Sequence, residues 1–156
     1  MDWTVFFVFL LACGAAASTG VLFPPGDWYR KLEKPRWTPP NRAFPIVWTA
    51  LYLAMAIAAA RISTLSGTEP SAGLGLALWA AQIALNTLWT PVFFRLRRMK
   101  AGLAIISMLW LAVAAMTVVF WGLDPLAGLL VLPYLLWVTV AAALNATILS
   151  LNKGRA

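Results

Sequence analysis

Residues 103–121 read LAIISMLWLAVAAMTVVFW, a run of 19 residues without one charged side chain. An α-helix of that length measures roughly 28 Å, close to the ~30 Å hydrocarbon core of a bilayer. Four further apolar stretches have similar lengths, and they cover residues 3–23, 44–65, 74–94 and 126–149. The chain lacks the alternating segments of a membrane β-barrel, and backbone groups in lipid must bond within their own segment. The sequence therefore predicts a single all-α integral membrane domain over residues 1–156, a bundle of five transmembrane helices.

The composition excludes several classes of protein. Hydrophobic residues make up 62% of the chain and charged residues 11%, against roughly 25% charged residues in soluble domains. The single Cys and the absence of His rule out an internal disulfide, a Cys/His metal site and histidine-based acid–base catalysis. No metal is therefore predicted, and no cofactor is expected to be required. No Asp, Glu, Lys or Arg lies deep within an apolar stretch, which argues against a proton pump or an ion channel.

Basic residues are distributed unevenly between the two sides of the predicted bundle. One side holds the segment 24–43, the connection between the third and fourth spans, and the C-terminus. That side carries eleven of the twelve basic residues, and the other side carries only Arg61. The positive-inside rule then places the N-terminus outside and the segment 24–43 and the C-terminus in the cytoplasm. The net charge of +7 is accordingly attributed to orientation and to anionic lipid headgroups, and not to nucleic acid.

The segment 24–43 contains the sequence WYRKLEKPRWTPP at residues 28–40, which is rich in aromatic residues, basic residues and prolines. Long connections are usually either functional or disordered, and disordered segments are poor in aromatic residues. The prolines stiffen the connection because they restrict its backbone. Two interpretations remain open: a juxtamembrane loop that binds lipid headgroups, or a stiff lid over a pocket that opens on the cytoplasmic side.

Polar and aromatic residues within three spans follow helical spacing of three and four residues, so each set should share one face of its helix. The sets are Pro45, Trp48, Tyr52 and Met55; Trp79, Gln82, Asn86, Trp89 and Phe93; and Tyr134, Trp137, Ala141 and Asn145. The amides of Gln82 and Asn86 either join helices by hydrogen bonds or orient a ligand in an aromatic pocket, and the two roles are compatible. Tryptophans near the ends of spans are normally anchors at the membrane interface, which is the role expected of Trp3, Trp28, Trp110 and Trp121.

Small residues recur at four-residue spacing in and just before the span 74–94. They are Gly73, Ala77 and Ala81, with Ala84 beside them. Stripes of small residues let two helices approach closely. This stripe predicts either packing within the bundle or the seam of a homodimer.

Four blocks of sequence resemble the TspO/MBR translocator protein family, also called the peripheral-type benzodiazepine receptors. The blocks are W-Y-x-x-L-x-K-P-x-W-x-P-P from Trp28 to Pro40, P-x-x-W-x-x-L-Y-x-x-M from Pro45 to Met55, Gln82-x-x-x-Asn86-x-x-Trp89-x-x-x-Phe93-Phe94, and Pro133-Tyr134-x-x-Trp137 with Leu144-Asn145. Each block alone is a weak signal, whereas the four in this order cover nearly the whole chain and are highly specific together.

The resemblance implies a five-helix bundle, commonly dimeric, that binds porphyrins such as protoporphyrin IX in a pocket under the first loop. It also implies binding of synthetic drug ligands of the benzodiazepine-receptor type. The implied roles are porphyrin sensing, transport or regulation; the alternatives are light-dependent porphyrin degradation through Trp48 and Trp137, which would make the protein an enzyme, or a regulatory membrane scaffold. The ligand-binding residues expected are Trp37 in the lid, together with Trp48, Tyr52, Gln82, Asn86, Trp89, Tyr134, Trp137 and Ala141.

The last span departs from the cholesterol motif of vertebrate family members. Ala146 follows Asn145 where the motif has Tyr, and no basic residue occurs before Lys153. Residues 42–47 fit the reversed motif, but such sterol patterns are weak. Sterol binding is therefore not expected. The charge asymmetry favours the bacterial inner membrane, and because some family members reside in outer membranes, that location remains the alternative.

Overall fold

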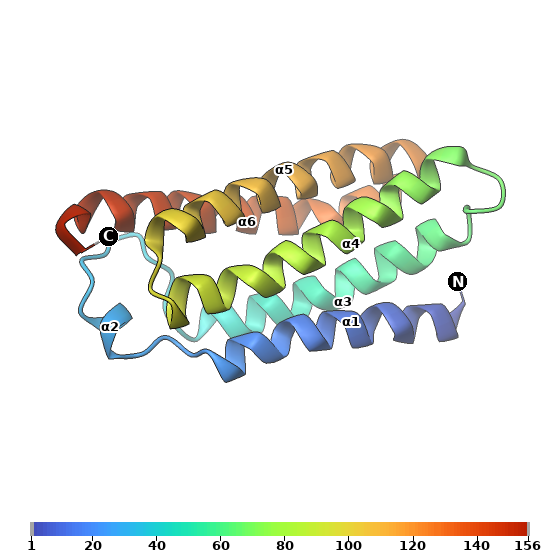
Figure 1. The fold of residues 1–156 in the computed structure, drawn as a ribbon. Coiled ribbons are helices and arrows are strands. Elements are labelled where there is room, and N and C mark those ends of the chain that lie inside the picture. The colour runs from blue at the N-terminus through green and yellow to red at the C-terminus, as the bar shows by residue number, and fades with distance from the viewer. Residues whose placement is uncertain (1, 156) are drawn as a thin grey trace.

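The computed structural model describes residues 2–155, and over that range it contains helices and connections without a strand. The long helices are α1 (Trp3–Leu22), α3 (Ala43–Ser63), α4 (Pro70–Thr90), α5 (Met99–Leu123) and α6 (Pro125–Leu151). Three short elements are α2 (Asp27–Arg30), the π-helix η1 (Pro91–Arg95) and the 3-10 helix η2 (Lys153–Arg155). The long helices lie side by side (Figure 1), and each is long and apolar enough to cross a bilayer. The predicted five-helix membrane bundle is confirmed.

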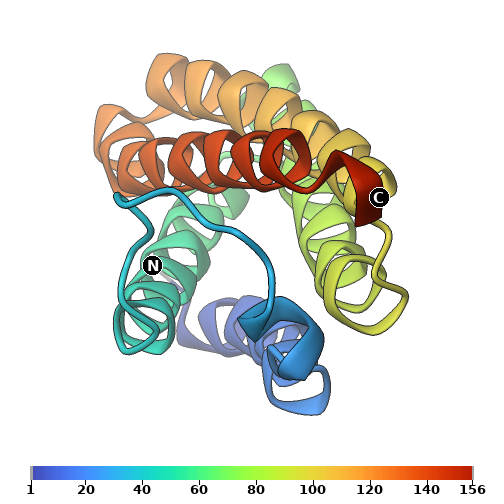
Figure 2. The same cartoon turned by 90° about the vertical axis from the view of Figure 1, so that its left-hand side faces the viewer.

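The long helices form a closed ring when viewed along the bundle (Figure 2). α1 contacts α3 and α4, α3 contacts α6, and α5 packs along both α4 and α6. α5 and α6 are joined by one residue, whereas α1 and α3 are joined by residues 23–42, which we call loop 1. Loop 1 contains α2 and crosses the end of the bundle at which the C-terminus also lies (Figures 1 and 2).

Prolines and an aspartate set several helix boundaries. Pro70 occupies the first turn of α4, where its missing N–H is not needed, so the helix begins before the predicted residue 74. Asp124 caps α6 by accepting a hydrogen bond from the Leu126 N–H at 3.0 Å. At Pro91 the chain continues as the π-helix η1, in which the Leu96 N–H donates to the Pro91 carbonyl at 2.9 Å. A proline cannot donate to the regular helical pattern, and the wider π turn accommodates it.

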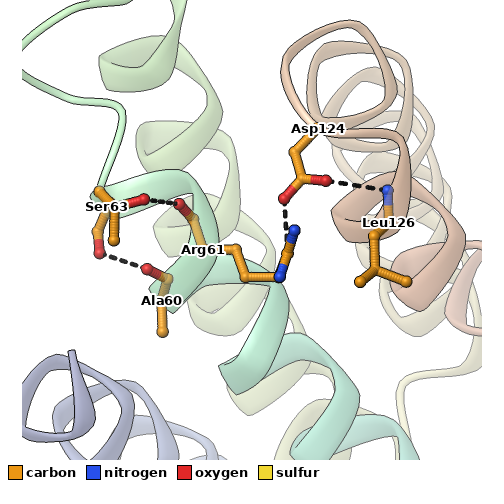
Figure 3. Close-up of polar contacts among 6 residues, drawn as sticks. Ala60, Arg61, Ser63, Asp124 and Leu126 are labelled. Atoms are coloured by element: carbon orange, nitrogen blue, oxygen red, sulfur yellow. Dashed lines mark hydrogen bonds and ion pairs between the residues drawn. The ribbon is translucent and has the colours of Figure 1, made fainter. Parts of the chain in front are cut away.

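An ion pair joins α3 to the start of α6 at the end of the bundle opposite loop 1 (Figure 3). Arg61 Nε donates to Asp124 Oδ2 at 2.6 Å. This hydrogen bond holds the pKa of the Asp124 carboxyl below its usual value, because it favours the charged form. The isolated basic residue on that side of the chain therefore holds two helices together.

Small residues close the bundle in the half opposite loop 1. The second half of α3 buries a nearly continuous row of side chains completely: Met55, Ala56, Ala58, Ala59, Ala60 and Ile62. A Cβ added at Gly128 would lie 2.7 Å from the Trp121 Cα, and one added at Gly75 would lie 3.0 Å from the Phe120 ring. The main chains of α5 and α6 therefore approach so closely near Gly128 that only glycine fits there.

Candidate functional site

A cavity of about 570 Å³ occupies the half of the bundle next to loop 1. Side chains from all five long helices, from η1 and from loop 1 line it. Loop 1 contributes Phe23, Pro25, Tyr29 and Asn41, and it therefore covers that end of the cavity. The volume falls within the range of about 300–1,000 Å³ that is usual for small-molecule sites in proteins.

Two tryptophans form walls of the cavity, and each is held by a stacked ring. Trp48 on α3 stacks on Tyr52 with ring centroids 5.3 Å apart and an interplanar angle of 29°. Trp89 on α4 stacks on Phe93 of η1 with centroids 5.1 Å apart and an angle of 14°. Aromatic pairs fix each other's orientation as well as burying apolar area. The result is a set of flat apolar surfaces suited to a flat, largely apolar ligand.

Four side chains form a buried polar network at the floor of the cavity. Asn86 Nδ2 donates to the hydroxyl oxygens of Tyr52 and Tyr134, at 3.3 Å each. The Tyr134 hydroxyl donates to Gln82 Oε1 at 2.8 Å. The network joins α3, α4 and α6, and its members Tyr52 and Asn86 also reach the cavity. The amides therefore do join helices, and Asn86 is in addition placed where a ligand would meet it.

Trp137 on α6 presents an N–H without a hydrogen-bond partner among the described residues, and so does the Nε2 of Gln82. The Trp137 ring lines the cavity and meets the Phe44 ring edge-on, with centroids 5.5 Å apart. Trp89 differs, because the Asn145 amide, turned so that both its polar atoms are satisfied, accepts from Trp89 Nε1 at 3.2 Å. A buried donor without a partner destabilises the empty protein. Trp137 is therefore a residue of the cavity wall whose buried N–H the described side chains leave unpaired.

An apolar cluster holds loop 1 against the bundle. Tyr29 and Leu32 are buried against a group that includes Phe93. Lys34 Nζ donates to the carbonyls of Arg30 and Leu32 at 3.3 and 3.1 Å, and it lies 4.6 Å from the centroid of the Tyr29 ring. Burial raises the pKa of the Tyr29 hydroxyl and lowers the pKa of the Lys34 ammonium. Loop 1 is thus a cover in which Tyr29 and Lys34 are fixed by contacts.

The structure brings most of the predicted ligand-binding residues together. Those on the cavity wall are Trp48, Tyr52, Asn86, Trp89, Trp137 and Ala141. Gln82 and Tyr134 are fully buried behind the floor and do not line the cavity. Trp37 does not line it either, and its side chain is 50% exposed. Between residues 28 and 40 of loop 1, the aromatic residue that lines the cavity is Tyr29, because the turn of α2 carries it onto Phe93 and Phe94.

The wall formed by α1 was not predicted from the sequence. Its small residues Ala16, Ala17 and Gly20 line the cavity, and nothing lies within 4 Å of a Cβ added at Gly20. Small side chains at helical spacing indicate that something approaches a helix closely, but they do not reveal whether that neighbour is a helix or a ligand. The spacing of small residues in α1 was therefore visible in the sequence, but it did not distinguish a neighbouring helix from a ligand.

The predicted dimer seam lies on the outer face of α4. Gly73, Ala77, Ala81 and Ala84 are all exposed, and nothing lies within 4 Å of a Cβ added at Gly73. Packing within the bundle is instead made by Ala72, Gly75 and Trp79 on the buried face of the same helix. The stripe is consequently free to meet a second molecule, and its role as a seam stays a prediction.

Trp110 differs from the expected interface anchors. It lies near the middle of α5, roughly 16 Å along the helix from Met99. Its Nε1 donates to Thr139 Oγ1 of α6 at 2.8 Å. An indole N–H within hydrocarbon needs an acceptor, and Thr139 supplies one. The expectation that Trp110 is an interface anchor is wrong, since it links α5 to α6 at mid-depth.

Comparison with known proteins agrees with this architecture. The sequence model of the TspO/MBR family matches residues 5–151. The protein named Protein CrtK from Rhodobacter capsulatus is 51% identical over 154 residues, covering 99% of this chain and 96% of the relative. The tryptophan-rich sensory protein of Cereibacter sphaeroides is 50% identical over 155 residues, with coverages of 99% and 96%, and the human translocator protein is 35% identical over 156 residues, with coverages of 97% and 92%. The chain, a multi-pass membrane protein, belongs to the TspO/MBR family.

Proposed function

We propose that the protein binds tetrapyrroles such as protoporphyrin IX in the cavity under loop 1, for porphyrin sensing, transport or regulation. The observation that carries this proposal is the cavity of about 570 Å³ with Trp48, Trp89 and Trp137 on its walls. A flat apolar macrocycle is complementary to such walls. Its carboxylates would find partners among the exposed basic residues of loop 1, such as Arg36 and Arg42.

The ligand selectivity follows from the side chains available. The chain has no His, so haem gains no histidine ligand to its iron, and we expect haem and the metal-free ring to bind with similar affinity. Synthetic ligands of the benzodiazepine-receptor type are expected in the same cavity, where the Trp137 N–H offers a donor to a carbonyl oxygen. No cofactor or metal ion is required for either kind of binding.

Titration of the purified protein with protoporphyrin IX tests the proposal through quenching of tryptophan fluorescence. Saturable quenching is expected, and Asn86→Ala should weaken it because the variant removes the polar floor. Trp110→Phe is the control, since Trp110 lies outside the cavity lining. Quenching that never saturates would refute the proposal. It would favour the alternative function, a regulatory membrane scaffold.

A second candidate is light-dependent degradation of the bound porphyrin, favoured by the position of two indoles, Trp48 and Trp137, on the cavity wall. The porphyrin is itself the photosensitiser, so an adjacent indole need only donate an electron or trap the excited state. Illumination of the porphyrin complexes of Trp48→Phe and Trp137→Phe should then give less product than wild type. Equal product formation in both variants would reject a catalytic role for these tryptophans.

We further propose a homodimer that forms through the outer face of α4. The exposed small residues Gly73, Ala77, Ala81 and Ala84 leave that face flat enough for another helix. Ala81→Phe should convert dimers to monomers in detergent, as measured by light scattering during size-exclusion chromatography. If the wild type is a dimer and Ala81→Phe has the same mass, this seam is excluded.

The proposed orientation places loop 1 and the C-terminus in the cytoplasm, with the bacterial inner membrane as the favoured location. Its support is the concentration of basic residues at the loop 1 end. A reporter fused to the C-terminus that is active only in the periplasm should remain inactive. Reporter activity would reverse the orientation.

A further inference from the structure

The side chain of Asn152 joins loop 1 to the end of α6 by hydrogen bonds. The Glu33 N–H donates to Asn152 Oδ1 at 3.1 Å, and Asn152 Nδ2 donates to the Glu33 carbonyl at 3.0 Å, although the two residues are 119 positions apart. Asn152 Nδ2 also donates at 2.8 Å to the Ile148 carbonyl, which accepts from the Asn152 backbone N–H at 3.1 Å as well. The Asn152 residue is only 5% exposed. Water therefore competes poorly for these bonds.

Asn152 bonds to the main chain of loop 1 and not to one of its side chains. Both atoms that Asn152 meets at Glu33 are backbone atoms, and the Glu33 residue is exposed. An Asn amide provides an acceptor and two donor hydrogens on one plane, and all three functions are used here. Alanine supplies none of them, and aspartate supplies no donor. The contact therefore depends on the residue at position 152 and is insensitive to the residue at position 33.

The contact lies in the middle of loop 1, between the parts that cover the cavity. Tyr29 on one side and Asn41 on the other line the cavity. Leu32, next to Glu33, is buried in the same cluster as Ile148 of α6. The ends of loop 1 are held by α1 and α3, so Asn152 adds a polar attachment at its centre. Figure 2 shows loop 1 crossing the end of the bundle from α2 to α3, beside α6.

We propose that Asn152 is a positioning residue, a latch that holds loop 1 closed over the cavity and slows the escape of a bound ligand. Asn152 is absent from the cavity lining and acts through loop 1. The part of the proposal that concerns ligand escape rests on the proposed function. The part that concerns the closed loop does not.

Amide hydrogen exchange in the ligand-free protein tests the latch directly, because the Glu33 N–H is one of its bonds. In Asn152→Ala the exchange at Glu33 should become about tenfold faster, the factor that corresponds to one hydrogen bond of ordinary strength. Glu33→Ala keeps both backbone atoms and should exchange like wild type once intrinsic rates are corrected. Ser150→Ala is the matched control on α6, since the Ser150 hydroxyl donates to the Thr147 carbonyl of its own helix. If the Glu33 amide of Asn152→Ala exchanges at the wild-type rate, the proposal is overturned.

Release of protoporphyrin IX tests the consequence of the latch for ligand. Asn152→Ala should lose the porphyrin about tenfold faster, with no slower association, when recovery of tryptophan fluorescence is followed after mixing with empty vesicles. Asp124→Asn, which weakens the opposite end of the bundle, should release it at the wild-type rate and so excludes general loosening as the cause. An unchanged release rate in Asn152→Ala would overturn the role in ligand escape. A wild type that binds no porphyrin would refute the proposed function, and the exchange measurement would still decide whether Asn152 holds the loop.

Discussion

The two halves of the bundle are built from the same helices and differ in side-chain size. Along α3 the half next to loop 1 carries Trp48 and Tyr52, and the other half carries alanines that are fully buried. The alanines let neighbouring helices touch, whereas the aromatic rings hold them apart around a cavity of about 570 Å³. One helix can therefore close the bundle at one end and enclose a site at the other.

The difference separates stability from function. Empty space and a buried N–H without a partner both destabilise a protein, and both occur in the half next to loop 1. The tightly packed half, with its glycine contacts and its ion pair, must supply the compensating stability. Substitutions in the packed half should therefore change stability with little effect on ligand affinity. Substitutions in the half next to loop 1 should change ligand affinity with little effect on stability.

The largest effect is expected at Gly128 in the packed half. The Cβ of Gly128→Ala would lie 2.7 Å from the Trp121 Cα, a main-chain atom that cannot rotate away. We expect a loss of about 3 kcal/mol in the free energy of unfolding, measured in detergent, with an unchanged porphyrin affinity of the folded fraction. Gly122→Ala is the matched control, because nothing lies within 4 Å of the added Cβ. Equal unfolding midpoints for Gly128→Ala and Gly122→Ala would show that α5 and α6 do not approach each other closely at Gly128.

The next effect is expected at Trp137 in the half with the cavity. Trp137→Phe keeps an aromatic ring and removes an N–H that has no partner in the empty protein. Stability should therefore change little, while porphyrin affinity measured by fluorescence titration should fall about tenfold if that N–H bonds the ligand.

Trp110→Phe should show the opposite pattern. It breaks the bond to Thr139 and should lower stability by about 1 kcal/mol without changing porphyrin affinity. Parallel losses of affinity in the two variants would remove the functional distinction between these tryptophans.

A smaller effect is expected at the ion pair in the packed half. Asp124→Asn should cost at most about 1 kcal/mol at neutral pH, since the Arg61 side chain is 36% exposed and water screens the pair. The pKa of Asp124 is lower in the folded protein than in the unfolded chain. The stabilisation is therefore fully present above the unfolded pKa of about 4 and is lost as the pH falls through the folded pKa. Unfolding measurements should show wild type and variant converging at low pH, and a constant difference would contradict this account.

The smallest effect is expected at Trp37. Because Trp37 lies outside the cavity lining and is half exposed, Trp37→Ala should leave porphyrin affinity nearly unchanged in the same titration. A loss as large as that in Trp137→Phe would restore Trp37 to the binding site and extend the functional half of the molecule into the exposed part of loop 1.

Residues spaced along one helix were predictable, and residues that meet across the fold were not. Trp48, Asn86 and Trp137 were identified because three- and four-residue spacing puts polar and aromatic side chains on one helical face. The pairing of Asn152 with Glu33 and of Arg61 with Asp124 joins parts of the chain that no periodicity connects. Trp110 was misjudged for a related reason, since its acceptor Thr139 lies on another helix.

The sequence by itself determined that this protein is a five-helix membrane bundle with its basic residues gathered at one end. It could do so because bilayer thickness imposes a length on every apolar run, and that length is visible in one dimension. Only the tertiary structure decided that the small residues of α1 complete a cavity, that Tyr29 and not Trp37 enters from loop 1, and that Asn152 holds this loop. Such features depend on which faces of separate helices meet, and that is settled by packing in three dimensions.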